Sequence, residues 1–272
     1  MGQGMLELFQ ITSDPAFAQR CDALGGFRLF VDLERMGKAE RQAGRNTFIS
    51  EHQLRDVGRV RAVLRQSKLM VRVNPLHDGT PAEVDAVLAE GADLLMLPMF
   101  TTPAQLRTFS DVVAGRAPIV PLLETAQALH CVEDWAGTPG LHEIFVGLND
   151  LHIALGCRFM FEPLADGSVE RVARAARAHG LPFGFGGIAR MESGGLLPGR
   201  DVLAEHLRLG SRSVILSRTF HGEPGIDFEG EIGALREAER ELAARTPAQV
   251  QADAARIAAR IRSVAADLAA RP

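Results

Sequence analysis

Short apolar runs alternate with amphipathic stretches along nearly the whole chain. The apolar runs are typical of strands buried on both faces, and the stretches between them have helical periodicity. Strands are predicted at Met5–Ile11, Arg28–Leu33, Leu69–Asn74, Leu94–Met99, Ile119–Glu124, Glu143–Leu148, Phe183–Ile188 and Ser213–Ser217. Helices are predicted at Pro15–Leu24, Glu51–Gln66, Pro81–Glu90, Pro103–Ala114, Thr125–Trp135, Val169–His179, Asp201–Leu209 and Glu231–Ala244. This α/β alternation with eight strands favours a closed (β/α)8 TIM barrel over an open sheet.

The chain has more helix at its C-terminus than a barrel needs. A further helix is predicted from Thr246-Pro247 to about Ala270, with the threonine as N-cap and the proline in the first helical position. We therefore divide the chain into a catalytic barrel, residues 1–245, and a C-terminal helix, residues 246–272. This helix either packs on its own barrel or docks on a neighbouring subunit. Because the barrel wall is already complete, the second alternative is favoured and predicts a homo-oligomer.

Size and charge exclude several classes of protein. A length of 272 residues suits one α/β barrel, and a net charge of −4 with interspersed signs argues against a nucleic-acid partner. No apolar run is long enough to span a bilayer, and the N-terminus does not resemble a signal peptide, so no membrane partner is expected. Three scattered cysteines form no disulfide framework, which favours a cytoplasmic protein.

Two carboxylates end apolar runs. Glu124 closes Pro118–Glu124, and Asp150 closes Ile144–Asp150. In a parallel barrel such residues converge on the mouth, where two carboxylates suit Mg²⁺, Mn²⁺ or another divalent cation. Strand alternation would place Asp150 on the face of Leu148. The alternative is that each acid caps the following helix, a role more usual for aspartate than for glutamate.

An arginine lies inside an apolar strand. Arg72 stands between valines and two residues before Asn74, which is also expected at the mouth. A buried guanidinium needs a partner such as a carboxylate. One interpretation is a salt bridge to Glu34 or to another acid of the barrel wall. The other is that Arg72, as a catalytic and substrate-binding residue, contacts a substrate carboxylate or a developing enolate oxygen.

Weaker signals complete the candidate site. Gly186 and Gly187 end the seventh strand and could let backbone amides approach a ligand. Gly147 and Asn149, beside Asp150, are also assigned to substrate binding. His52 could act as an acid or base reaching over the mouth, and the alternative is a surface histidine.

Lysine usage bears on the chemistry. The chain has only Lys38 and Lys68. A Schiff-base aldolase needs a lysine at the barrel mouth, whereas Lys68 begins a strand and Lys38 lies in a polar loop. We therefore expect a metal ion rather than an imine to stabilise an enolate.

These motifs together resemble the HpcH/HpaI aldolase and citrate lyase β-subunit family of phosphoenolpyruvate/pyruvate-binding barrels, from about Phe27 to Arg218. The matching stretches are Val31–Glu34, Val71–Asn74, Gly91–Asp93, Leu97–Met99, Leu122–Thr125 and Gly147–Leu151. The resemblance implies carbon–carbon bond cleavage, with Arg72 on the substrate and Glu124 and Asp150 on Mg²⁺. It also implies oligomers that exchange C-terminal helices.

Two departures leave the reaction open. The aldolases of the family carry Glu-His after the second strand, where this chain has Glu34-Arg35; the citrate lyase branch carries a lysine where this chain has Met99. His52 or a metal-bound water could replace the missing base. The expected function is a metal-dependent aldolase or lyase, with a 2-keto acid and an aldehyde as its small-molecule partners. The alternatives are an acyl-CoA lyase of the citrate lyase type and a catalytically silent ligand-binding barrel.

Overall fold

Eight parallel strands close into a barrel in chain order. The structure is a computed structural model that describes residues 5–37, 50–192, 195–222 and 225–270. The strands are β1 (Glu7–Ile11), β2 (Phe27–Asp32), β3 (Lys68–Arg72), β4 (Leu94–Leu97), β5 (Ile119–Leu123), β6 (Ile144–Val146), β7 (Phe183–Ile188) and β8 (Ser213–Leu216). With helices between the strands, the fold is the predicted (β/α)8 barrel with an extra C-terminal helix.

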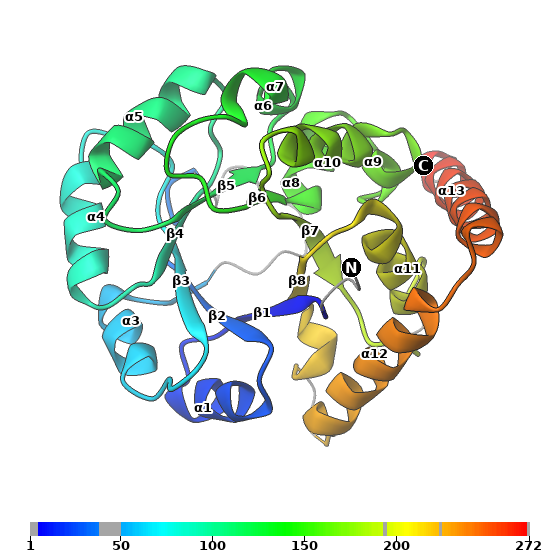
Figure 1. Cartoon of the computed structure of the whole chain (residues 1–272), viewed down its shortest axis with the longest axis horizontal. Coiled ribbons are helices and arrows are strands. Elements are labelled where there is room, and N and C mark those ends of the chain that lie inside the picture. Colours follow the sequence, from blue (N-terminus) through cyan, green and yellow to red (C-terminus); the bar gives the residue numbers. More distant parts are fainter. Residues whose placement is uncertain (1–4, 38–49, 193–194, 223–224, 271–272) are drawn as a thin grey trace. The chain divides into compact units, whose positions relative to one another are not determined.

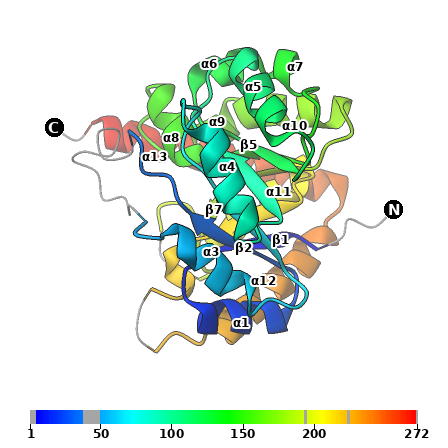
Figure 2. The same ribbon diagram turned by 90° about the vertical axis from the view of Figure 1, so that its left-hand side faces the viewer.

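Two compact units divide the chain, and residues 9–144 form one of them. Its helices are α1 (Pro15–Leu24), α3 (Leu54–Arg61), α4 (Thr80–Ala89), α5 (Pro103–Val113), α6 (Ala126–His130) and α7 (Val132–Trp135). Strands β2 to β5 are almost wholly buried, as expected for strands covered on both faces. On their outer side α3, α4 and α5 follow one another, and α4 and α5 pack side by side (Figure 1, Figure 2).

The other unit consists of residues 1–8 and 145–272. Its helices are α8 (Leu148–Ala154), α9 (Glu162–Ala165), α10 (Ser168–Ala178), α11 (Gly199–Leu209), α12 (Phe228–Ala243) and α13 (Pro247–Ala269), with a 3₁₀ turn at Arg218–Phe220. The C-terminal helix α13 packs against α9 and α11 and buries Ile257 and Ile261 (Figure 1). Docking of α13 onto a neighbouring subunit stays a prediction.

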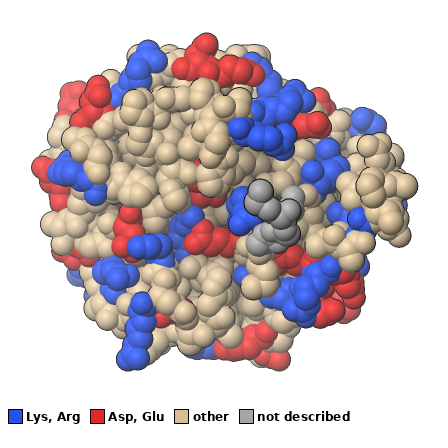
Figure 3. All heavy atoms as spheres, in the orientation of Figure 1, with Lys and Arg blue, Asp and Glu red and all other residues tan. Residues whose placement is uncertain are grey.

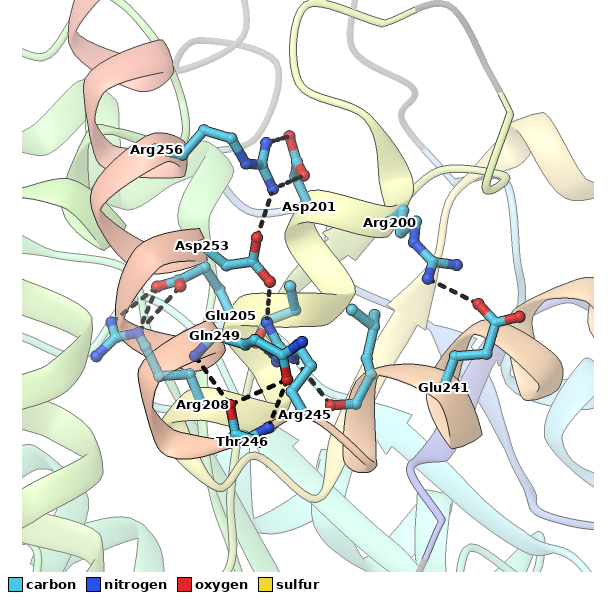
Figure 4. Close-up of polar contacts among 12 residues, drawn as sticks. Arg200, Asp201, Glu205, Arg208, Glu241, Arg245, Thr246, Gln249, Asp253 and Arg256 are labelled. Atoms are coloured by element: carbon cyan, nitrogen blue, oxygen red, sulfur yellow. Dashed lines mark hydrogen bonds and ion pairs between the residues drawn. The ribbon is translucent and has the colours of Figure 1, made fainter.

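Ion pairs connect α13 to its own unit as well. The Arg256 guanidinium donates to both carboxylate oxygens of Asp201 on α11, at 2.8 and 3.1 Å, and Arg245 pairs with Asp253 at 2.8 Å (Figure 4). Thr246 caps the helix as predicted, because its hydroxyl accepts the amide N–H of Gln249. The predicted start of this helix is therefore confirmed.

Several element boundaries differ from the prediction. The helix expected over Thr125–Trp135 is divided into α6 and α7 at Cys131. Strand β6 ends at Val146, and Leu148 already belongs to α8, because the apolar side chains Leu148 and Leu151 are both buried at helical spacing. The helix expected over Glu51–Gln66 begins only at Leu54 and ends at Arg61.

Charged side chains of both signs are interspersed on the face drawn in Figure 3. In the part of the chain that the structure describes, no helix is both long and apolar enough to cross a bilayer.

Candidate active site

The centre of the candidate site is an ion pair between neighbouring strands. Asp32 ends β2 and Arg72 ends β3, and the two residues stand opposite each other in the β2–β3 register. The Arg72 Nε and Nη2 atoms each donate to one Asp32 carboxylate oxygen at 2.8 Å. Both side chains are largely buried, with exposures of 14% and 4%. This two-point geometry fixes the orientation of the guanidinium.

Two further acids act on the same guanidinium. Arg72 Nη1 lies 3.4 Å from a carboxylate oxygen of Glu34, and the charge of Glu124 also acts on Arg72. Burial alone would lower the pKa of Arg72, but Asp32 and then Glu34 and Glu124 raise it above its usual value. The three acids are each at most 4% exposed.

Glu124 follows β5 directly, and a backbone amide holds its carboxylate. The N–H of Met99, two residues after the end of β4, donates to Glu124 Oε1 at 3.1 Å. The cap of helix α6 is the next residue, Thr125, whose hydroxyl accepts the N–H of Ala128. The alternative in which Glu124 caps this helix is therefore wrong. Its predicted role as a metal ligand stays open.

Asp150 has a different local setting from the one predicted. It lies in the first turn of α8, with Gly147 as the N-cap and Asn149 between them. In a helix, residues two apart do not share a face, so the expectation that Asp150 and Leu148 share a strand face is wrong. Asp150 belongs to the unit of residues 145–272 and Glu124 to the other unit. Their convergence on one cation stays a prediction, as do the substrate contacts of Gly147 and Asn149.

Within the residues that the structure describes, no cluster of three or more His, Cys, Asp or Glu side chains could hold a metal ion. A site built on the predicted pair of carboxylates would therefore rely on water and substrate for its remaining ligands. This is usual for Mg²⁺, which keeps several waters. Oxygen donors alone also agree with a hard cation.

Asn74, predicted to bind substrate, holds the loop that follows β2. Its Oδ1 accepts the backbone N–H groups of Arg35 and Met36 at 2.9 and 3.0 Å. Its Nδ2 donates to Glu83 at 2.7 Å. The residue pattern contains no signal for this structural role. A direct contact between Asn74 and substrate stays a prediction.

His52 lies beside the ion pair but in a tautomer unsuited to a base. Its Nδ1 accepts the backbone N–H of Asp32 at 3.1 Å. A neutral imidazole with Nδ1 as acceptor carries its proton on Nε2, so the ring has no second lone pair to receive a proton. The predicted role of His52 as base requires this bond to be released first.

The two glycines of β7 differ in their surroundings. A Cβ atom on Gly186 would lie 2.6 Å from the Leu148 side chain at the start of α8, and Gly186 has a φ of +21°. A Cβ on Gly187 would meet only a carbonyl oxygen at 3.8 Å. Gly186 is thus required for the packing of Leu148, two residues before Asp150. The approach of a ligand to either amide stays a prediction.

Of the two lysines, Lys68 is not placed for imine chemistry by the structure. Lys68 is exposed at the start of β3, the end of the strand opposite Arg72. Lys38 lies outside the described residues.

Residues 6–185 match the HpcH/HpaI aldolase/citrate lyase family. This stretch is more than half of the chain. The chain belongs to this family. The predicted resemblance is confirmed, and the ion pair of Asp32 and Arg72 lies within the matched residues.

The curated relatives match over shorter stretches. A (3S)-malyl-CoA thioesterase of Cereibacter sphaeroides is 33% identical over 117 residues, which cover 41% of this chain and 40% of that protein. An acetoacetate decarboxylase of Mesorhizobium japonicum is 32% identical over 84 residues, 31% of this chain and 34% of that protein. The chain thus spans about two fifths of the length of the first of these relatives and less of the second.

Solved structures agree in fold. The citrate lyase β subunit of M. tuberculosis, complexed with oxaloacetate and magnesium, has a TM-score of 0.61 at 18% identity, covering 88% of this chain and 98% of that one. A HpcH/HpaI aldolase/citrate lyase family protein from Burkholderia cenocepacia has a TM-score of 0.62 at 19% identity, covering 88% and 95%. At these identities the likeness shows the fold alone.

Proposed function

We propose that this protein is a divalent-metal-dependent carbon–carbon lyase of the aldolase type, acting on a 2-keto acid. The observation that carries the proposal is the buried guanidinium of Arg72 with three carboxylates around it, at strand ends of a barrel of this family. Glu124 and Asp150 would hold the ion, Mg²⁺ or Mn²⁺. When bound, the ion supplies a Lewis acid for negative charge that develops on the keto oxygen.

Arg72 is the residue that would orient the substrate. A guanidinium has five N–H donors, of which Asp32 takes two and Glu34 attracts one. The outer Nη1–Nη2 edge can receive a substrate carboxylate. Because Asp32 holds the Nε–Nη2 edge, the guanidinium needs no rearrangement before it binds a substrate carboxylate. This favours a bound substrate in one orientation.

The cleavage needs one proton to leave and one to arrive. A base takes the proton of the 4-hydroxyl group, the C3–C4 bond breaks, an aldehyde leaves, and C3 of the remaining enolate is protonated to give pyruvate. In the tautomer found here, His52 can donate a hydrogen bond through Nε2 and cannot accept the hydroxyl proton. We therefore favour a water molecule as the base, with His52 as its hydrogen-bonding neighbour.

The test is pyruvate release from 4-hydroxy-2-keto acids, with and without EDTA and with added Mg²⁺ or Mn²⁺. Glu124→Ala and Asp150→Ala should each lower turnover roughly 100-fold or more, because each removes a proposed ligand of the ion that would stabilise the developing charge. Asp134→Ala removes an exposed carboxylate of α7 and serves as the matched control. Full turnover in either site variant, or indifference to EDTA, overturns the metal assignment. No turnover of any keto acid or thioester by the wild-type protein would favour the catalytically silent barrel.

A second candidate substrate is an acyl-CoA. The match to a malyl-CoA thioesterase supports it, as does the Asp32-Leu33-Glu34 segment, which is similar to the citrate lyase branch. Malyl-CoA distinguishes the reactions by product. A lyase gives a two-carbon acyl-CoA and an aldehyde acid, whereas a thioesterase gives free CoA thiol and malate. Thiol titration and aldehyde trapping on the same sample decide between them.

A further inference from the structure

Met99 has an unusual backbone conformation for its residue type. Its φ angle is +56°, and among the described residues only Met99 and Ala114 combine a positive φ with a side chain. Ala114 is the left-handed cap that ends helix α5, a common place for this conformation. Met99 ends no helix; it follows β4 and Pro98. For a residue with a Cβ atom the left-handed region is strained, and such strain persists only where the surroundings impose it.

The surroundings of Met99 hold the chain on both sides. Before it lies the buried strand β4. After it, the Phe100 carbonyl accepts the Thr125 hydroxyl at 2.8 Å, and the Phe100 ring packs edge-on against Trp135 with centroids 5.0 Å apart. Phe100 and Trp135 are almost fully buried. The position of residue 100 is thus fixed independently of Met99.

The same turn directs one amide at the candidate site. Because residue 100 is held in place, a change in the φ angle of Met99 would reorient the Met99 amide N–H relative to the residues that follow it. At the observed angle this N–H donates to Glu124 Oε1 at 3.1 Å. Thr125, which anchors Phe100, is the next residue after Glu124, so the segments 98–100 and 124–125 are joined by two hydrogen bonds of opposite direction.

We propose that the left-handed turn at Met99 is a positioning device, which sets the Glu124 carboxylate for cation binding through the Met99 amide and is held in place by the Thr125–Phe100 bond. This inference rests on the proposed function, because it takes Glu124 to be a metal ligand. Met99 touches no reacting atom in this scheme and is a positioning residue. A merely structural turn would affect stability without affecting the affinity for the cation.

The first experiment varies the cost of the left-handed conformation at residue 99. Met99→Gly removes that cost, Met99→Leu is the size-matched reference, and Met99→Val raises it, because β-branched residues are genuine outliers at positive φ. The dissociation constant of Mn²⁺ is measured for the full chain by electron paramagnetic resonance, together with the melting temperature. We expect the Met99→Val variant to bind Mn²⁺ roughly tenfold more weakly than the Met99→Leu variant, a difference of about 1.4 kcal/mol in binding free energy. The Met99→Gly variant should bind Mn²⁺ at least as tightly as Met99→Leu. Equal affinities in all three variants overturn the proposal.

The second experiment removes the anchor instead of the turn. Thr125→Val deletes the hydroxyl that binds the Phe100 carbonyl, and Thr125→Ser restores it. Because Thr125 also caps α6, the matched control is Thr102→Val, which deletes the cap of α5 within the same unit. We expect a loss of Mn²⁺ affinity in Thr125→Val, recovery in Thr125→Ser, and wild-type affinity with a lower melting temperature in Thr102→Val. Equal Mn²⁺ affinities of Thr125→Val and Thr102→Val also overturn the proposal.

The Glu124→Ala variant tests the proposed metal site separately from the positioning role of Met99. If Glu124→Ala abolishes Mn²⁺ binding while the Met99 and Thr125 variants bind normally, the positioning role is wrong and the metal site stands. If Glu124→Ala binds Mn²⁺ like the wild type, the metal site and the positioning role both fall.

Discussion

Two networks of arginines and carboxylates in this protein differ in burial and in the way arginines and acids are paired. Around Arg72, three buried acids face one guanidinium. Between α11, α12 and α13, three arginines face three acids: Arg200 pairs with Glu241, Arg245 with Asp253, and Arg256 with Asp201 (Figure 4). The second set is balanced and more exposed, with Arg200 and Arg256 about half exposed.

The difference distinguishes a candidate site from a network that holds helices together, which we call the clamp. The second network lines a cavity of about 370 Å³, yet each of its three arginines already has a carboxylate partner, so the cavity offers a ligand no uncommitted cation. Its bonds instead join α13 to α11 and to Arg245 of the α12–α13 connection, and α11 to α12. Around Arg72 three buried acids act on one buried guanidinium at strand ends of the barrel. Burial at the ends of barrel strands, rather than the number of ion pairs, therefore distinguishes the candidate site from the second network.

The largest expected effect is at Arg72. Arg72→Met removes the guanidinium that pairs with the buried acids Asp32 and Glu34, and loss of one partner from a buried pair costs about 3–5 kcal/mol. Urea unfolding should show this loss, and turnover should also fall. Arg116→Met, which breaks the exposed pair with Asp85, is the control and should cost less than about 1 kcal/mol. If both variants unfold at the same urea concentration, the buried acids are not charged and the comparison fails.

The barrel itself could be predicted from the sequence, because apolar runs, helical periods and glycines after helices agree along the chain. The need of Arg72 for a carboxylate was also predictable. Its main partner was not, since the choice of Asp32 over Glu34 depends on the β2–β3 register. Asp150 was placed one element too early because apolar residues continue on both sides of Gly147, which is the N-cap of α8.

Other features of the site have no signal in the residue pattern. Methionine is not a residue that favours positive φ, so the turn at Met99 results from tertiary contacts on both sides of it. The tautomer of His52 depends on one backbone N–H from a strand 20 residues earlier. Local sequence predicts which groups are present, and tertiary packing decides which of their atoms remain available.

A smaller effect is expected at His206, a buried titratable group on α11 without a counter-charge. Its ring stacks on Phe185 at 3.6 Å, and burial lowers its pKa to about 3. The Ser211 hydroxyl donates to the Ser213 carbonyl and so accepts from His206 Nδ1–H, while Nε2 has no hydrogen-bond partner. This ring is neutral in the folded protein.

The sign of the pH effect follows from that neutrality. Between pH 6.5 and about 3 the unfolded chain binds a proton at His206 and the folded chain does not, so stability falls as the pH falls through this window. From pH 6.5 to 4.5 the loss should be about 2 kcal/mol. His206→Phe keeps the stacked ring and removes the proton. Urea unfolding at pH 7 and 4.5 should show a smaller acid loss in this variant than in the wild type, and an unchanged loss would contradict the assignment.

The smallest effect is expected in the balanced network. Arg256→Met breaks the fork onto Asp201 and should cost at most about 1 kcal/mol, because Arg256 is half exposed and its charge is screened. The arginine bonds also lower the pKa of Asp253, and Arg245 contributes more than Arg256. Their contribution to stability is therefore complete above pH 3.8 and is lost as the pH falls below that value.

Hydrogen exchange should be faster in α13 of the Arg256→Met variant, and turnover should equal that of the wild type. In 1 M NaCl the hydrogen exchange of α13 in the wild type should approach that in the variant, because the Debye length there is about 3 Å and the ion pair is screened. Arg260→Met, which removes a bond to the Leu196 carbonyl rather than an ion pair, should not show this convergence. A loss of turnover in Arg256→Met would mean that the clamp and the candidate site are coupled, and the distinction between them would then have to be abandoned.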